Sequence, residues 1–320
     1  MRQLSPLGLV IPFAWIITTL LPAAGQAAPP DRRFAATDPD EAGDDFAYQG
    51  EYAGTIVADR RRVATGLQVI ARGDGKFDAV RFRGGLPGAG WDRATEQPYS
   101  GSLRDGVLVL HSDAGGTIMA DGRAATVYDS DGNTLGNLEK TLRVSPTLGA
   151  APPPGATVLF DGQSTELLEG ANNYDESLLD VGVTTKLLVK DFHMHLEFRL
   201  PYMPYATGQG RANSGVYIQR RYEVQILDSF GLEGVANECG GLYRQQPPDV
   251  NMCLPPLTWQ TYDIWFTAAR FDEEGNKTAN ARITVLHNGI PIHDDYEVVA
   301  KTGAGRPEGP EPMPILLQDH

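Results

Sequence analysis

The run Asn213-Ser-Gly-Val-Tyr-Ile-Gln-Arg-Arg-Tyr-Glu-Val-Gln-Ile-Leu-Asp228 decides the fold of the second half of the chain. Apolar residues alternate with polar ones in both halves of it: Val216 and Ile218, then Tyr222, Val224 and Ile226. Successive side chains of a strand point to opposite faces, so this period of two predicts two half-buried antiparallel strands.

The other face of these strands would carry a row of hydrogen-bonding side chains. Arg221, Glu223 and Gln225 supply a cation, a carboxylate and an amide, and Asn213 precedes them. Faces that serve only solubility tend to mix Lys, Thr, Ser and Glu. The set therefore indicates a polyol ligand, with an ordinary solvated face as the alternative interpretation.

The bulk composition narrows the class of protein. With 320 residues the chain can form one large or two ordinary domains. A hydrophobic content of 41% with 36 Gly and 23 Pro is typical of a globular protein rich in strands and loops. The net charge of −14 argues against a nucleic-acid partner, because phosphate binding needs a basic surface.

The N-terminus has the pattern of an export signal. A positive start is followed by an apolar stretch and a small-residue cleavage region, which predicts a secretory signal peptide over residues 1–28. A retained anchor is disfavoured by Pro12 and Pro22, so we expect no membrane span after cleavage and a periplasmic or extracellular location. In such an oxidising compartment Cys239 and Cys253 are expected to form a disulfide.

The rest of the chain divides into four segments. Residues 29–45 read as a flexible acidic spacer, and residues 145–156 as a semi-rigid Pro-rich linker. Between them, short strand-like runs punctuated by glycines predict a small all-β sandwich or barrel over residues 46–144, of unassigned role. Residues 157–320 hold at least eight strand-like runs and no helical periodicity, which predicts an all-β, two-sheet jelly-roll sandwich.

A second polar row lies in the run from Phe192 to Leu200. Apolar residues occupy its even positions, so His193, His195 and Glu197 share the opposite face. Their spacing suits a divalent transition metal, although the neighbouring Arg199 is unfavourable for a cation. We therefore assign no firm cofactor and consider Glu197 a substrate-binding residue as well.

Two further residues are candidates for acid–base chemistry. A bulge after Gln225 would turn Asp228 to the face of Glu223, in a spacing similar to the Glu-x-Asp-x-x-Glu strand of laminarinase-type glycosidases. The amide at Gln225 makes ordinary double displacement doubtful, because that reaction needs two carboxyl groups about 5 Å apart. Near the C-terminus, Gln318 and His320 would share a face, and histidine titrates near neutral pH.

Residues 157–320 resemble the 3-keto-disaccharide hydrolase domain family. The resemblance rests on seven short motifs in order: 158–162, 191–199, 213–215, 221–229, 259–263, 285–289 and 317–320. Members of that family usually continue for one more strand, which predicts that this sequence is truncated. The first β domain looks like an N-terminal extension found in planctomycete members.

The resemblance implies a concanavalin-like jelly roll that cleaves glycosides already oxidised at C3 by a separate dehydrogenase. A base would remove the acidified C2 proton and expel the glycosidic group, and water would add afterwards. Glu223 or His320 would be the base, with the other, or Asp228, as the acid. This route needs no carboxylate nucleophile and so tolerates Gln225.

The same resemblance gives roles to the neighbouring polar residues. Arg221, Asn213 and Gln318 would hold the keto sugar and its developing enolate. The main rival is a non-catalytic carbohydrate-binding module, in which Tyr243 and Trp259 would stack on a sugar ring.

Overall fold

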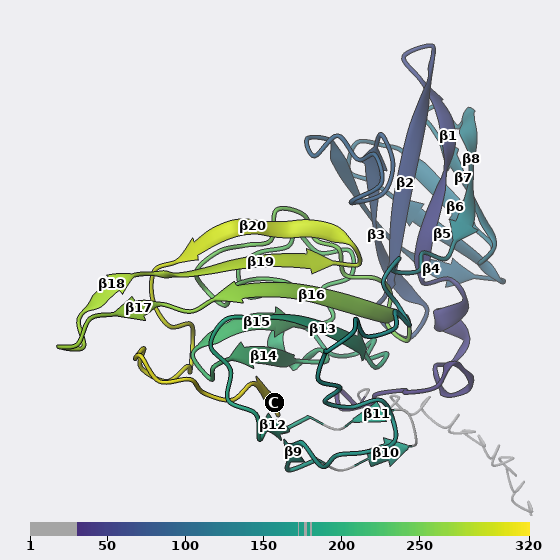
Figure 1. The fold of residues 1–320 in the computed structure, drawn as a ribbon. Helices are drawn as coiled ribbons and strands as arrows, with labels where there is room; N and C mark the ends of the chain where they lie inside the picture. Colours follow the sequence, from purple (N-terminus) through teal and green to yellow (C-terminus); the bar gives the residue numbers. More distant parts are fainter. Residues whose placement is uncertain (1–30, 172, 176–177, 180) are drawn as a thin grey trace, which may run out of the picture. The chain divides into compact units, whose positions relative to one another are not determined.

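The computed structural model describes residues 31–171, 173–175, 178–179 and 181–320 (Figure 1). The described residues are almost entirely strands and loops; their helices are three short 3-10 turns, η1 (Pro39–Glu41), η2 (Asp44–Ala47) and η3 (Gly208–Gly210). The all-β prediction is confirmed. The predicted signal peptide lies outside the described residues, within which no helix is long and apolar enough to span a membrane.

Residues 50–141 form a closed antiparallel barrel in which each strand pairs with the next and the last pairs with the first. Its strands are β1 (Gly50–Ala58), β2 (Arg61–Ala71), β3 (Lys76–Arg83), β4 (Glu96–Arg104), β5 (Val107–His111), β6 (Thr117–Ala120), β7 (Ala124–Tyr128) and β8 (Thr134–Thr141). The tight β1–β2 hairpin has positive φ at Asp59 and Arg60, which fits the strand twist. Of the two predicted architectures, the structure has the barrel.

Two packed sheets make up the later part of the chain (Figure 1). The five-stranded sheet has the order β15-β14-β21-β12-β9, with β9 (Leu168–Glu169), β12 (Thr184–Thr185), β14 (Ser214–Ile218), β15 (Tyr222–Ile226) and β21 (Leu316–Leu317). The four-stranded sheet has the order β13-β16-β19-β20, with β13 (Phe192–Arg199), β16 (Trp259–Thr267), β19 (Ala281–His287) and β20 (Ile290–Val298). Two two-stranded sheets also lie in this part of the chain: β10 (Asn173–Asp175) with β11 (Leu178–Leu179), and β17 (Arg270–Phe271) with β18 (Lys277–Ala279).

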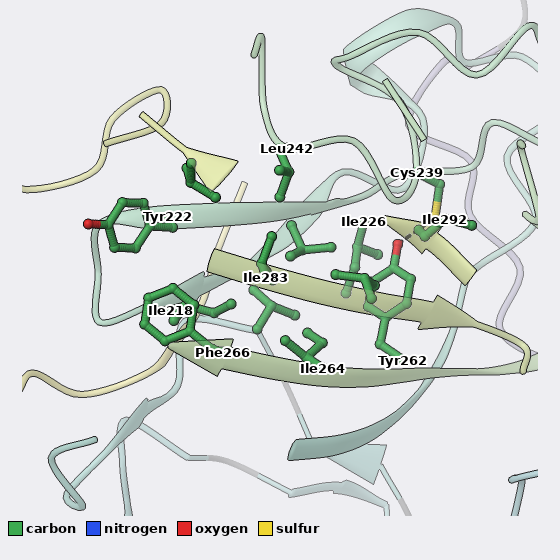
Figure 2. Close-up of a cluster of buried hydrophobic side chains, with 14 of the residues drawn as sticks. Ile218, Tyr222, Ile226, Cys239, Leu242, Tyr262, Ile264, Phe266, Ile283 and Ile292 are labelled. Atoms are coloured by element: carbon green, nitrogen blue, oxygen red, sulfur yellow. Dashed lines mark hydrogen bonds between the residues drawn. The ribbon is translucent and has the colours of Figure 1, made fainter. Parts of the chain in front are cut away.

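A single apolar cluster lies between the two sheets (Figure 2). Ile218 and Tyr222 from the five-stranded sheet belong to the same buried cluster as Ile264, Phe266 and Ile283 from the four-stranded sheet. Because successive side chains of a strand point to opposite faces, the residues between these apolar positions point away from the cluster. The predicted strands of the 213–228 run are confirmed.

The spacer and the linker are more ordered than the sequence predicts. Ala36 is buried and pairs with Tyr202 through two backbone hydrogen bonds, so the expected flexible spacer is fixed at this point. At the start of the predicted linker, Ser145 is buried and its hydroxyl lies 2.6 Å from the hydroxyl of Thr261 on β16. Backbone pairing fixes Ala36 and a hydroxyl contact fixes Ser145, and composition alone does not reveal either contact.

The predicted disulfide is absent, and the two cysteines are free buried thiols. The Cys239 sulfur lies 3.2 Å from the Tyr262 hydroxyl within the core (Figure 2). The Cys253 sulfur lies 3.6 Å from the carbonyl oxygen of Leu227. Burial among core partners, rather than a covalent bond, accounts for both residues in this structure.

Candidate functional site

Glu223 is the centre of a polar cluster on the outer face of the five-stranded sheet. In the antiparallel pair of β14 and β15, Tyr217 lies opposite Glu223 and Gly215 lies opposite Gln225. Directly after β21, the backbone N–H of Gln318 donates to the carbonyl oxygen of Gly215 at 2.8 Å. Opposite residues share a face, so three strands bring these side chains together on the side away from the core.

The carboxyl group of Glu223 is enclosed between two glycines. A Cβ atom at Gly215 would lie 2.6 Å from Oε1 of Glu223, and one at Gly303 would lie 3.2 Å from Oε2. Gly303 has a φ of +43°, and its Cβ position is also 2.8 Å from the ring of Tyr243. The carboxyl group fits only because neither glycine has a side chain, and Glu223 is 1% exposed.

Enclosure changes the acid–base behaviour of this carboxyl group. Burial raises the pKa of Glu223 to about 7, and a hydrogen bond with Tyr217 acts in the opposite direction. Within the described residues, Oε2 of Glu223 and Oε1 of Gln318 are both buried without a hydrogen-bond partner. Because the pKa lies near neutrality, this carboxyl group is suited to exchanging a proton with a bound molecule.

Amide side chains line the site next to Glu223. The Nε2 atom of Gln225 donates to Oδ1 of Asn213 at 3.0 Å and to Oε1 of Gln209 at 3.3 Å. The hydroxyl of Tyr243 donates to the same Gln209 oxygen at 3.4 Å. With the Gln225 amide rotated by 180°, its nitrogen instead donates to Oε1 of Glu223 at 2.9 Å. These groups can donate to and accept from sugar hydroxyls.

Two residues of this cluster are not among the sequence candidates. Tyr217 has a signal in the sequence, because its position in the period-two pattern places it on the face of Glu223. Gln209 has none: it lies in the 3-10 turn η3 and approaches Gln225 only in the folded chain. The structure thus keeps Glu223, Gln225, Asn213, Gln318 and Tyr243 from the predicted set and adds these two.

Arg221, predicted to bind substrate, has a structural role instead. It is 3% exposed, and its Nε atom donates to the carbonyl oxygen of Pro307 at 3.0 Å. Its Nη1 atom donates to the carbonyl oxygen of Glu311 at 3.0 Å. The residue precedes β15, so its long side chain reaches past the sheet edge and holds the 307–311 segment.

Asp228, predicted as an acid, is likewise separated from the site. The strand ends at Ile226, and the Asp228 carboxylate is buried against Arg211, with Nε to Oδ2 at 2.7 Å. Its other oxygen accepts from the backbone N–H of Phe230 at 3.2 Å. The bulge expected after Gln225 therefore does not return Asp228 to the face of Glu223. His320 is exposed, and among the described residues no hydrogen bond joins it to Glu223.

The second polar row lies on the other outer face of the sandwich, with the apolar core between it and Glu223. Glu197 accepts from the backbone N–H of Gly149 at 2.5 Å, and His195 Nδ1 lies 2.8 Å from Oδ1 of Asp263. The ring of His193 stacks on Trp265 at 4.1 Å.

This placement corrects three predictions from the sequence. Glu197 is not a neighbour of Glu223, because β13 belongs to the four-stranded sheet. Trp259 lies on the same sheet as Glu197, beneath the guanidinium of Arg199 at 5.6 Å from the ring centre. The His193, His195 and Glu197 set is not a metal site here: no three His, Cys, Asp or Glu side chains gather suitably anywhere in the described ranges.

The family model described as the 3-keto-alpha-glucoside-1,2-lyase-like domain matches residues 155–320. The match covers more than half of the chain, and the chain belongs to this family. The resemblance inferred from the seven motifs is thereby confirmed.

Two solved structures from Parabacteroides distasonis ATCC 8503, each described as a candidate glycosyl hydrolase, are similar to this chain. One has 31% sequence identity and a TM-score of 0.47 over 51% of this chain and 76% of its own. The other has 16% identity and a TM-score of 0.37 over 51% of this chain and 87% of its own. No curated protein matches the chain.

Proposed function

We propose that this protein is a carbohydrate-active enzyme that cleaves glycosides carrying a ketone at C3, by elimination followed by hydration. Membership of the 3-keto-alpha-glucoside-1,2-lyase-like family supports the substrate class. The observation that carries the proposal is the enclosed Glu223 carboxyl group, with its pKa of about 7 and an unpartnered oxygen. A separate dehydrogenase would supply the ketone, and the predicted signal peptide would export the enzyme.

Glu223 acts as the base in the first step. A ketone at C3 acidifies the proton on C2, and the deprotonated carboxylate removes that proton. The electron pair of the C2–H bond forms the C1–C2 double bond, and the C1–O bond to the leaving group breaks. The proton on Glu223 then returns to the leaving oxygen as an alcohol is released. Water adds at C1 in the second step, with a proton restored to C2.

The amides around Glu223 fit this chemistry better than double displacement. Retaining glycosidases need a second carboxyl group about 5 Å from the first. At the corresponding places on this face the chain has Gln225 and Gln318, and Asp228 is buried against Arg211. Amide N–H groups can instead donate to the enolate oxygen that develops at C3 during elimination.

Glu223→Gln tests the assignment. Purified protein is incubated with an aryl 3-keto-glucoside and, separately, with the unoxidised aryl glucoside, and release of the aryl alcohol is followed. We expect release from the keto substrate alone, and a loss of at least about 100-fold in kcat for Glu223→Gln, because the amide cannot accept the C2 proton.

Glu197→Gln is the matched control, since it makes the same chemical change on the opposite outer face of the sandwich. It should retain wild-type turnover. Equal turnover by Glu223→Gln and wild type would exclude Glu223 as the base. Binding of unoxidised oligosaccharide with no release from the keto substrate would favour the carbohydrate-binding module instead.

A further inference from the structure

We propose that Tyr217 is a positioning residue whose phenol hydroxyl holds the Glu223 carboxyl group in the orientation needed to remove a substrate proton. The expected effect on catalysis rests on the proposed function, whereas the contact between Tyr217 and Glu223 does not depend on it. Tyr217 is directly opposite Glu223 in the β14–β15 pair, and it is 4% exposed. The two side chains therefore leave the sheet side by side on the same face.

The pKa of the Tyr217 hydroxyl reflects the two groups beside it. Besides burial, the Glu223 carboxyl group raises this pKa and the Ala304 backbone acts in the opposite direction, as expected for a phenol that donates to the carboxyl group. Burial raises the pKa of Tyr217 well above its usual range, and the phenol stays a donor throughout the working pH range. A fixed donor of this kind favours the charged carboxylate over the neutral acid.

The backbone around this pair prevents the two groups from moving apart. The backbone N–H of Glu223 donates to Oγ1 of Thr302 at 2.6 Å, and Thr302 N–H donates to the carbonyl oxygen of Arg221 at 2.9 Å. The segment that contains Ala304 is thus tied to the edge of β15. Tyr217 therefore lies between this segment and its own strand, β14.

Among the described residues, the other groups around Glu223 are amides or side chains that bond elsewhere. Tyr217 is therefore the ionisable group placed to donate a hydrogen bond to the Glu223 carboxyl group. From β21 comes the neutral amide of Gln318, and from the 236–243 loop comes Tyr243, whose hydroxyl donates to Gln209. Lys301 donates to the carbonyl oxygen of Gly303 at 2.9 Å, and the Arg244 guanidinium lies 5.2 Å from the ring centre of Tyr243. The remaining neighbour on the strand, Gln225, is an amide.

Removing the hydroxyl should therefore make Glu223 harder to ionise. A hydrogen bond to a charged group corresponds to about one unit of pKa, so Tyr217→Phe should raise the titration midpoint of Glu223 by about one pH unit. Because the base must be deprotonated, kcat/KM rises with pH through the pKa of Glu223, and this acidic limb should move upward by the same amount. KM should change little, because the proposed role of Tyr217 is to orient Glu223 and not to contact the substrate.

The contact is tested on the full chain by ¹³C NMR titration of the glutamate carboxyl carbons, with the Glu223 signal identified by its loss in Glu223→Gln. Tyr222→Phe is the matched control: it makes the same change one residue from Glu223, but its hydroxyl bonds to Glu308 instead. We expect an upward shift in Tyr217→Phe and none in Tyr222→Phe. The pH profile with the aryl 3-keto-glucoside is recorded on the same samples.

The outcomes separate this inference from the proposed function. An unchanged Glu223 midpoint in Tyr217→Phe overturns the role of Tyr217, whatever the enzyme does. A shifted midpoint with an equally shifted acidic limb supports both. A shifted midpoint in a protein that does not turn over the keto substrate supports the Tyr217 contact and defeats the proposed function. Loss of stability without a shift would mean that Tyr217 only fills space.

Discussion

At the scale of single residues, the site depends as much on missing side chains as on those present. Gly215 and Gly303 leave the space in which the Glu223 carboxyl group lies, and the amides of Gln225 and Gln318 border it. The raised pKa follows from this enclosure, because burial penalises the charged form. A carboxyl group on an open sheet face would lack this property.

Gly215→Ala tests the importance of this space. The added Cβ would lie 2.6 Å from Oε1 of Glu223, so the carboxyl group must move. Displacement of a catalytic group by about 1 Å can cost on the order of 100-fold in rate, and we expect a loss of that size in kcat. Overpacking should also lower the free energy of unfolding by about 1–3 kcal/mol.

Gly210→Ala is the control for this change, because a Cβ there meets no atom within 4 Å. It should leave turnover of the aryl 3-keto-glucoside and the urea midpoint close to wild type. Wild-type kcat in Gly215→Ala would show that the enclosure of Glu223 is not needed for catalysis.

At the scale of elements, the period-two pattern predicts both strands of the 213–228 run and the face that each residue occupies. Glu223 and Gln225 lie on the face where this pattern places them, because local alternation is fixed by strand geometry. The pattern fails where the strand ends. Arg221 lies before β15 and Asp228 after it, and the contacts of both are set by loops distant in sequence.

Asp228→Asn distinguishes an ion pair that supports the end of β15 from a catalytic acid. Removing the charge of Asp228 leaves the Arg211 guanidinium buried without its partner, at a cost of about 3–5 kcal/mol in the free energy of unfolding. The folded fraction should keep wild-type kcat. Urea denaturation measures the loss in the free energy of unfolding. Turnover at urea concentrations below the unfolding midpoint measures kcat of the folded protein.

The exposed pair of Arg282 and Asp295 offers a matched comparison, with side chains 43% and 70% exposed. Asp295→Asn should leave the urea midpoint close to wild type, because solvent screens surface pairs. A 100-fold fall in kcat for folded Asp228→Asn would restore Asp228 as a candidate acid.

At the scale of the whole molecule, residues 145–157 connect the barrel to the sandwich. The first part of this segment is held on the four-stranded sheet, and the second part is exposed to solvent. Thr147 donates to Oδ2 of Asp263 at 2.9 Å and Gly149 donates to Glu197, so residues 145–149 are fixed on the four-stranded sheet. Residues 150–157 are exposed. The polar row on β13 and β16, which the sequence presents as a metal or substrate site, holds this segment.

Limited proteolysis with proteinase K should therefore cut first within residues 150–157, since exposed segments are the preferred sites of nicking. Mass spectrometry of the earliest fragments locates the cut. Thr147→Val removes the hydroxyl that donates to Asp263 and should extend cleavage into residues 145–149. First cleavage within 145–149 of the wild-type protein would contradict the fixed half of this segment.

From its own pattern, the sequence determined the β class of the chain, the hairpin from Asn213 to Asp228 and the polar face that carries Glu223, because alternation along a strand is a local property. Only the tertiary structure decided that Glu197 lies on the opposite face, that Asp228 pairs with Arg211 and that Gly303 closes over Glu223. These depend on which strands share a sheet and which loops fold back upon them. Contacts between residues far apart in the chain set both, and periodicity carries no information about them.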